Sequence, residues 1–440
     1  MKNTLRLPKM VVSDRRGHIF EIPGLCMAGM SLNSPVLPQS RDLIPLPEGS
    51  DLFTLPERTA IGYDPTAEEF VEVRTYRGGE VFPVAAFMAP AHLQLYRSAF
   101  RKLPQAPCLS LYSYTAVGWK NGAFYAAGIR IDQDRRQDLK FVDREEIRRK
   151  ALILRSEKQD NRLIRHLIDN CVFRYGCPAA RNFVMGRWEC PLPTSPSCNS
   201  LCIGCISQQH PHTRVKASQD RIEFVPTVDE ILEVALPHLE TAPRPVVSFG
   251  QGCEGEPLLV GEVIEESIRQ LRKKTRRGVI NINTNGSRPE VVERLFNAGL
   301  DSIRVSLNSA QQHLYTAYFR PHRYGFDHAK ETLRIARHFG RWSSLNYFMF
   351  PGFTDHRTEL GALEGLIREV RLNMIQTRNL NIDPDWYIEE LALNDLEQDS
   401  LGMRNWAGHI RERFPWIKLG YFNPPREEMK ERHFRFPLKS

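Results

Sequence analysis

The sequence has no long hydrophobic run. Its first 17 residues contain no apolar stretch of signal-peptide length, and no later run approaches the roughly 20 apolar residues of a membrane span. Internal repeats and low-complexity tracts are also absent. With 440 residues, 41% of them hydrophobic and 25% charged, the composition predicts a soluble chain with room for two domains. We therefore expect a cytoplasmic protein with no membrane partner.

Cysteine is scarce outside one segment. Of nine cysteines, six lie between Cys171 and Cys205, and none follows Cys253. Disulfides are typical of small secreted proteins, whereas bunched cysteines in a chain of this length favour metal binding in a reducing compartment. The crowded segment is therefore the first place to look for a functional site.

Three of these residues, Cys198, Cys202 and Cys205, have the spacing C-x3-C-x2-C. An iron–sulfur cube normally takes four thiolates, so three would leave one iron open to a ligand that is not protein. The spacing resembles the signature of the radical S-adenosylmethionine (radical SAM) family. The resemblance implies a [4Fe–4S] cluster that binds S-adenosylmethionine (SAM) at the open iron, splits it reductively and so generates a 5′-deoxyadenosyl radical. From the spacing alone, structural zinc with His210 or His212 as fourth ligand stays an alternative.

Downstream of this loop, strand and helix patterns alternate, which predicts a parallel sheet with crossover helices. Six strand and helix units match the partial (β/α)6 TIM-type barrel of the radical SAM family, preceded here by an N-terminal β-rich (α+β) domain. Functional residues of such barrels gather at the carboxyl ends of the strands. The expected strands are Asn182–Trp188, Pro245–Phe249, Val279–Asn283, Ser302–Asn308, Ser344–Phe350 and Leu372–Arg378.

Two motifs at these strand ends resemble SAM-binding motifs of the family. Gly255-Glu256-Pro257 is similar to Gly-Gly-Glu-Pro, whose backbone and glutamate bind the methionine amino group; a buried carboxylate suits an ammonium. Here Glu254 replaces the first glycine. Thr284-Asn285-Gly286 is similar to the Thr-Asn-Gly after the third strand. The resemblance therefore assigns Gly255, Glu256, Thr284 and Asn285 to the SAM site.

Later strand ends carry further expected ligands. By position in the family, Ser306 and Asn308 would meet the ribose hydroxyls and the methionine carboxylate, and Phe350 and Gly352 would lie along adenine. The residue before the third cysteine is commonly aromatic in the family, whereas here it is Gly204, so adenine needs another stacking surface.

No catalytic residue follows from the sequence. Cys253, Tyr347 and Arg378 are candidate partners of a substrate radical. Cys171, Cys177 and Cys190 are candidate ligands of an auxiliary iron–sulfur cluster or of zinc. A fourth ligand is missing, for which Cys253 is a candidate, and ordinary thiols are the alternative.

We expect four segments: a β-rich domain over 1–142, a helical connector over 143–170, the radical SAM core with a cysteine-rich start over 171–395, and a C-terminal extension over 396–440. The clearest local pattern in the first is a hairpin turning at Asn121-Gly122, since Asn-Gly supplies the positive φ angles of a tight primed turn.

Peptide, RNA and small metabolite all stay open as substrates, with an electron donor such as flavodoxin or ferredoxin. The net charge of +8 permits RNA without requiring it. The basic run 272–277 reads as a solvated helix end or as a nucleic-acid patch. The contrasting hypothesis is a non-catalytic zinc-binding protein with a nucleic-acid-binding basic surface.

Overall fold

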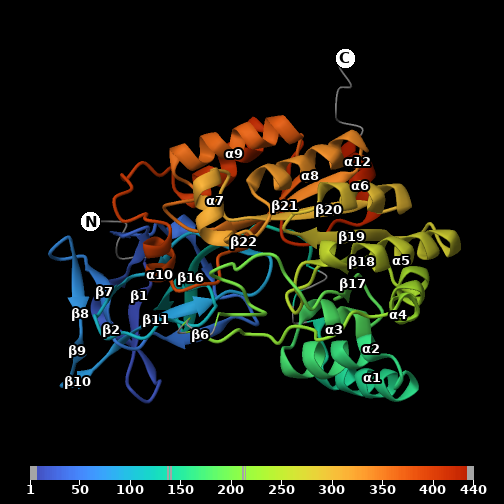
Figure 1. Cartoon of the computed structure of the whole chain (residues 1–440). Helices are drawn as coiled ribbons and strands as arrows, with labels where there is room; N and C mark the ends of the chain where they lie inside the picture. Colours follow the sequence, from blue (N-terminus) through green and yellow to red (C-terminus); the bar gives the residue numbers. More distant parts are fainter. Residues whose placement is uncertain (1–6, 136–137, 139–140, 211–212, 214, 434–440) are drawn as a thin grey trace.

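A computed structural model describes residues 7–135, 138, 141–210, 213 and 215–433 (Figure 1). His212, one of the two histidines considered as a zinc ligand, lies outside these residues. None of the helices in the described ranges combines the length and the apolar character needed to cross a membrane.

The core is a seven-stranded parallel sheet with its strands in chain order, as the fold class predicts. Its strands are β17 (Glu189–Leu192), β18 (Val246–Phe249), β19 (Val279–Thr284), β20 (Ser302–Leu307), β21 (Trp342–Met349), β22 (Met374–Asn379) and β23 (Lys418–Gly420). The seventh strand comes from the segment expected as a C-terminal extension and pairs in parallel with β22. The sheet is open, with β17 and β23 at its edges.

The first strand was predicted in the wrong place. Residues of the expected strand Asn182–Trp188 partly belong to helix α3 (Pro178–Val184), and β17 begins only at Glu189. Pro178 occupies the first turn of α3, where its fixed φ and missing N–H favour a helix start. The tendency of Pro178 to start a helix outweighs the strand tendency of the apolar residues within 182–188.

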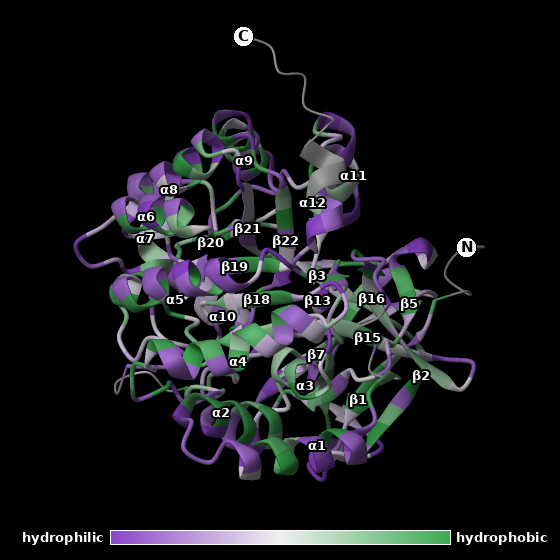
Figure 2. Cartoon of the chain, turned by 90° about the vertical axis from the view of Figure 1, so that its right-hand side faces the viewer, coloured by the Kyte–Doolittle hydropathy of each residue, from purple (hydrophilic) through white to green (hydrophobic). Residues whose placement is uncertain are grey.

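The two faces of the sheet differ in polarity. One face carries apolar side chains such as Val247, Ile280, Ile303 and Leu345, all fully buried. Helices pack over this face (Figure 1), namely α4 (Val228–Thr241), α5 (Gly261–Lys274), α6 (Pro289–Ala298), α8 (Phe326–His338) and α9 (Arg357–Val370). In Figure 2, α5, α6 and α8 carry both colours, as amphipathic covering helices should.

The other face, called the inner face below, is polar. Along a strand, alternate residues point to opposite faces, so Asn281 lies on the side opposite to Ile280. Asn281 donates to Ser248 Oγ at 2.8 Å, and Ser302 Oγ donates to Asn281 Oδ1 at 2.8 Å. These bonds run from strand to strand and satisfy polar groups that would otherwise be buried without partners.

Helix boundaries follow the capping signals in most cases. Helix α4 begins with the capping box of Thr227 and Glu230, and α6 ends at Gly299, which has a left-handed φ of 115°. Helix α6 itself begins at Pro289, with Arg288 as its N-cap and no side-chain capping bond.

The N-terminal domain is antiparallel and β-rich. Strands β15 (Thr115–Lys120) and β16 (Ala123–Arg130) form the predicted hairpin, in which Asn121 and Gly122 have φ of 51° and 78°. The other strands of its 14-stranded sheet are β1 (Lys9–Ser13), β2 (Ile19–Met27), β3 (Gly29–Ser31), β4 (Ser34–Val36), β5 (Leu43–Pro45), β6 (Asp51–Thr54), β7 (Arg58–Asp64), β8 (Glu69–Val73), β11 (Phe82–Phe87), β12 (His92–Gln94), β13 (Arg97–Ser98) and β14 (Phe100–Lys102).

The segment between the N-terminal domain and the parallel sheet is helical. It contains α1 (Arg144–Glu157), which starts at the N-cap Asp143, and α2 (Arg162–His166). A π-helix, η4 (Leu167–Arg174), follows α2 directly. Nothing in the apolar periodicity indicated this rare helix type.

The N-terminal domain covers the carboxyl ends of β21 and β22. Leu32 donates its backbone N–H to Pro351 O at 2.9 Å, and Gln94 donates its own to Asn379 Oδ1 at 2.9 Å. Arg58 forms an ion pair with Asp383 at 2.9 Å, and both side chains have no exposed surface. These contacts bring the domain to the edge of the sheet where the predicted site lies.

Side chains of the basic run 272–277 contact other parts of the fold. Arg272 forms an ion pair with Asp301, and Arg277 donates to the carbonyl oxygen of Ala242 at 2.7 Å. This use favours the helix-end interpretation over a nucleic-acid patch.

We predict that Arg58→Met lowers the free energy of unfolding by about 3–5 kcal/mol, because it leaves the Asp383 charge buried without its partner. Chemical denaturation followed by circular dichroism measures the change. Arg101→Met is the control, since the Arg101–Glu72 pair is 69% and 44% exposed and its loss should change stability by less than about 1 kcal/mol. Equal effects of the two substitutions would contradict the prediction.

Candidate functional site

The cysteine loop, defined here as residues 197–205, is fixed by its backbone. Leu201 donates its N–H to Phe319 O and Ile203 donates its own to Tyr318 O, both at 3.1 Å. These acceptors belong to the end of α7 (Gln312–Phe319). Cys198, Cys202 and Cys205 are all half-buried. The loop therefore holds its three cysteines against the core rather than presenting them to solvent.

Gly255 packs directly under this loop. Its N–H donates to Ser195 O at 2.7 Å, and the next N–H, of Glu256, donates to Ser197 O at 2.8 Å. A Cβ at residue 255 would lie 1.9 Å from Ser197 O. Only glycine permits this approach, so the loop after β18 and the cysteine loop fit together through their backbones.

Glu254, the departure from the family motif, is an anchor for the segment before the cysteine loop. Its buried carboxylate accepts hydrogen bonds from the backbone N–H groups of Thr194 (2.7 Å), Ser195 (2.9 Å) and Gln251 (2.6 Å). Burial raises the pKa of Glu254 to about 6, although these hydrogen bonds act in the opposite direction. Sequence reasoning missed this role, and its only signal was the replaced glycine.

Glu256 links the ends of β18 and β19. Its carboxylate accepts from the Thr284 hydroxyl, from Asn285 N at 2.8 Å and from Leu258 N at 3.0 Å. Burial raises the pKa of Glu256 to about 7. A carboxylate has about four acceptor positions, so one is left for a ligand.

Asn285 connects this pair to the cysteine loop. Its side-chain amide donates to Asn199 Oδ1 at 2.8 Å and to Ser200 Oγ at 3.0 Å. The structure thus brings Glu256, Thr284 and Asn285 together with the cysteine loop in one hydrogen-bonded network.

The thiols lie close enough for their charges to interact. Burial, the Glu256 carboxylate and the Cys205 thiol together raise the pKa of Cys198 to about 11. Burial and the other two thiols raise the pKa of Cys202 well above its ordinary value. Arg221 opposes this effect, with Nη2 3.8 Å from Cys205 Sγ. A cation beside clustered thiols favours their thiolate form, which is the form that binds metal. Arg221 lies in a polar loop with no motif that would have identified it.

Gly204 makes room for an aromatic side chain from elsewhere. A Cβ on Gly204 would lie 2.5 Å from the hydroxyl oxygen of Tyr318. The Tyr318 ring is buried, with ring centroids 5.4 Å from Phe348 and 6.0 Å from Tyr387. An aromatic side chain from α7 therefore contacts the cysteine loop at Gly204.

Two side-chain amides near the ends of β20 and β21 have an unused acceptor. Asn308 is fully buried and donates to Leu314 O at 3.1 Å, while Asn346 donates to Ser306 Oγ at 3.2 Å. Among the described residues, Oδ1 of each amide has no hydrogen-bond partner. Buried acceptors of this kind suit a ligand that carries hydroxyl or ammonium donors, as SAM does.

Phe350 and Gly352 lie where the two domains meet. Phe350 is buried, with its ring centroid 5.0 Å from that of Tyr387. Gly352 has a φ of 91°, and a Cβ there would lie 2.3 Å from Leu32 N. The N-terminal domain therefore presses on the segment expected along adenine.

The three candidate partners of a substrate radical, Cys253, Tyr347 and Arg378, lie in different parts of the structure. Tyr347 is on the helix-covered face of the sheet and its hydroxyl donates to Glu359. Arg378 is on the inner face and donates to the Tyr421 hydroxyl at 3.2 Å. Cys253 lies away from both, 3.6 Å from Cys171 between sulfur atoms. Of the three, only Arg378 lies on the polar inner face.

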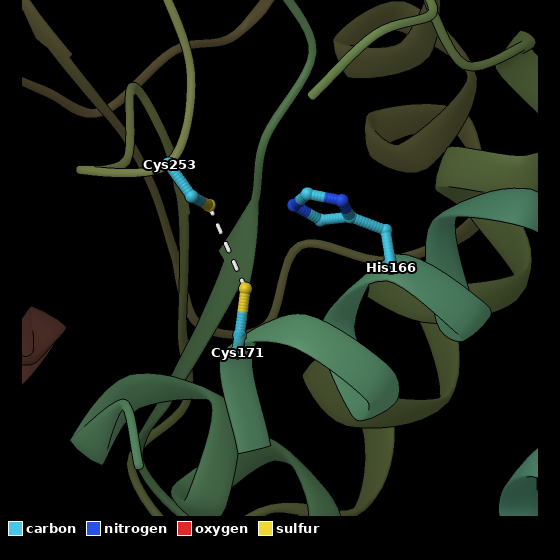
Figure 3. Close-up of side chains that lie close together, drawn as sticks. All are labelled: His166, Cys171 and Cys253. Atoms are coloured by element: carbon cyan, nitrogen blue, oxygen red, sulfur yellow. Dashed lines mark hydrogen bonds between the residues drawn. The ribbon is translucent and has the colours of Figure 1, made fainter. Parts of the chain in front are cut away.

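Two of the three cysteines considered for an auxiliary cluster are joined through their backbones, since Cys177 donates its N–H to Cys171 O at 2.7 Å. Cys177 is the N-cap of α3, and Cys190 is fully buried in β17. In the part of the chain that the structure describes, the one set of three metal-type ligand atoms within 4.8 Å of one another belongs to His166, Cys171 and Cys253 (Figure 3). His210 is exposed and belongs to no such set among these residues.

We predict that Gly255→Ala displaces the cysteine loop, because the new methyl group would overlap Ser197 O. The expected result is protein that retains less than half of the parent's iron after anaerobic reconstitution, measured by iron analysis. Gly365→Ala is the matched control: Gly365 is exposed in α9 with nothing within 4 Å of a new Cβ, so iron should be unchanged. Full iron loading of Gly255→Ala would show that the loop tolerates the methyl group.

A family model described as Radical SAM superfamily matches residues 192–360. No curated protein matches the sequence. Among solved structures, Streptococcus suis SuiB bound to S-adenosylmethionine is 15% identical, with a TM-score of 0.36, and the match covers 56% of this chain and 54% of that one. The same protein bound to its precursor peptide SuiA is 16% identical, with a TM-score of 0.33 and coverages of 46% and 43%.

HydG, a maturase of the [FeFe]-hydrogenase, is 14% identical, with a TM-score of 0.37 and coverages of 69% and 70%. The chain thus spans about half the length of the SuiB chains that it matches.

Proposed function

Since residues 192–360 belong to the radical SAM superfamily, we propose that this enzyme binds a [4Fe–4S] cluster through Cys198, Cys202 and Cys205 and cleaves SAM reductively. The observation that carries the proposal is the hydrogen-bonded network that joins the cysteine loop to the ends of β18 and β19. It links the two SAM motifs to the predicted cluster ligands without an intervening segment.

With the cluster and SAM bound, the chemistry supplied is one-electron cleavage of a carbon–sulfur bond, which yields a 5′-deoxyadenosyl radical able to take hydrogen from a C–H bond. The protein binds and orients the reacting groups and excludes water from them. Glu254 and Gly255 hold the cysteine loop in place, and Arg221 balances the thiolate charge. A one-electron donor such as flavodoxin or ferredoxin would supply the electron.

SAM binding is assigned to the residues around this network. The free acceptor position of Glu256 and the backbone at Gly255 suit an ammonium group. The unused amide oxygen of Asn308, with Ser306 beside it on β20, suits ribose hydroxyls. Phe350 and Gly352 remain the proposed adenine contacts. Thr284 and Asn285 act by positioning Glu256 and the cysteine loop.

The polar side chains of the inner face suit the binding of a polar substrate. Arg378 lies there, and so does Arg304, which is buried and whose pKa burial lowers to about 10. Peptide, RNA and small metabolite all offer polar groups to such a surface. The auxiliary cluster at Cys171, Cys177 and Cys190 is not part of this proposal.

We predict that the triple variant Cys198→Ala, Cys202→Ala, Cys205→Ala loses the roughly four irons of a cube. It should form no 5′-deoxyadenosine from SAM and dithionite above background, measured by chromatography after anaerobic reconstitution. Cys108→Ala, at a half-buried cysteine of the N-terminal domain, is the control and should retain both properties. A triple variant that binds iron and cleaves SAM like the parent would refute the proposed function.

We also predict that Arg221→Met lowers the reduction potential of the cluster by roughly tens of millivolts, because a nearby cation stabilises the more negative reduced state. A redox titration followed by electron paramagnetic resonance measures the shift. Arg269→Met, on the exposed surface of α5, should leave the potential unchanged. A potential that stays the same or rises in Arg221→Met would contradict the assigned role.

A further inference from the structure

His166, Cys171 and Cys253 form a second group of metal-type ligands, which the function proposed above does not use. The two sulfur atoms are 3.6 Å apart, and the three ligand atoms all lie within 4.8 Å of one another. All three residues are more than nine-tenths buried. Figure 3 shows the imidazole of His166 pointing toward both sulfur atoms. The group therefore has the composition and the convergence of a binding site rather than of an accidental surface cluster.

His166 leaves one ring nitrogen unsatisfied. Its Nδ1 lies 3.1 Å from the side-chain amide of Asn170, whereas Nε2 faces the Cys253 thiol and makes no hydrogen bond of standard geometry in the described part of the chain. Leaving such a buried polar atom unpaired is unfavourable by about 1–3 kcal/mol. Because the ring is directed at the two sulfur atoms, a metal ion between them would satisfy Nε2.

The backbone is shaped to bring two of the ligands together. His166 ends α2, and Cys171 lies five residues later in the π-helix η4. In an α-helix, residues five apart point in directions about 140° apart. The wider turn of a π-helix, with its i→i+5 hydrogen bonds, places them on the same side. Single π-turns are rare and occur frequently at functional sites.

The distances distinguish a metal site from a disulfide. A disulfide requires about 2.05 Å between sulfur atoms, so the two thiols are not joined. Two thiolates on one tetrahedral zinc ion, with Zn–S of about 2.3 Å, lie about 3.8 Å apart. The observed 3.6 Å excludes a disulfide and is compatible both with the second case and with a thiol–thiol hydrogen bond. Two sulfur ligands and one imidazole are a donor set that zinc prefers.

Asn170 provides the outer contact that such a histidine needs. A ligating imidazole donates its other N–H to a neighbouring acceptor, which orients the ring. The oxygen and nitrogen of an amide occupy nearly the same positions, so the Asn170 side chain can present its oxygen to Nδ1–H.

We propose that His166, Cys171 and Cys253 bind one zinc ion, which leaves the fourth position of the tetrahedral ion to a further ligand. The ion would tie the connector helices to the loop after β18. Cys253 directly precedes Glu254 and Gly255, so the ion would also restrain the loop on which the cysteine loop rests. The proposal uses other residues than the cluster assignment and does not depend on it.

The test measures zinc in the full-length protein by inductively coupled plasma mass spectrometry. The parent should contain about one zinc per chain after exposure to a weak chelator. His166→Gln, Cys171→Ser and Cys253→Ser should each bind zinc at least about tenfold more weakly. Cys190→Ser is the matched control, since Cys190 is equally buried but outside the group, and should retain zinc. The triple alanine variant of the cysteine loop should lose iron and keep zinc, which separates this proposal from the proposed function.

A variant that fails to fold would also lose zinc, so cobalt substitution of the parent provides an independent readout. Tetrahedral Co²⁺ bound by thiolates absorbs visible light, and the thiolate charge-transfer band should weaken in Cys171→Ser. The proposal is overturned if the three ligand variants hold zinc as tightly as the parent. It is equally overturned if they lose iron and sulfide instead, or if peptide mapping of anaerobically prepared protein finds a Cys171–Cys253 disulfide.

Discussion

Two buried carboxylates determine where the three cysteines of the predicted cluster site lie. Transferring an ionised carboxylate into the interior is strongly unfavourable unless hydrogen bonds replace its water. Glu254 and Glu256 meet this requirement by accepting bonds from backbone N–H groups and a hydroxyl on three separate segments. Each bond that satisfies a carboxylate also fixes the position of a loop. The hydrogen bonds that offset the unfavourable burial of the two carboxylates therefore also define the geometry around the cysteine loop.

The polarity of the sheet explains how a large buried core coexists with a polar interior. Val, Ile and Leu on one face pack under the covering helices and supply most of the apolar burial. On the inner face, Ser248, Asn281 and Ser302 are joined by hydrogen bonds across neighbouring strands. Near the strand starts, Val246, Val279 and Met374 pack with Met429 of α12 (Arg426–His433). Polar groups are therefore left to the carboxyl-terminal part of the inner face, where the SAM motifs lie.

Local signals in the sequence were sufficient for much of the fold. Short apolar runs predicted five of the strands, and Asn121-Gly122 predicted the hairpin turn. The expected strand at Asn182–Trp188 failed because Pro178 starts a helix that overlaps it. The motifs also led to Glu256, Thr284 and Asn285, which the structure joins in one network.

Other features of the site depend on contacts that no local pattern encodes. The approach of Cys171 to Cys253 joins residues 82 positions apart, and the π-helix that contains Cys171 has no periodic signature. Arg221 and Tyr318 reach the cysteine loop from segments without motifs. Their roles arise from tertiary packing, which propensity and spacing do not describe.

The backbone partners of the cysteine loop carry a consequence for biosynthesis. The loop is completed at residue 205, yet it is held by Gly255 and Glu256, by Asn285 and finally by Tyr318 and Phe319. More than a hundred further residues must leave the ribosome before the last of these supports exists. Iron and sulfide would therefore be inserted after translation of the barrel, because the nascent chain does not yet have the complete binding site.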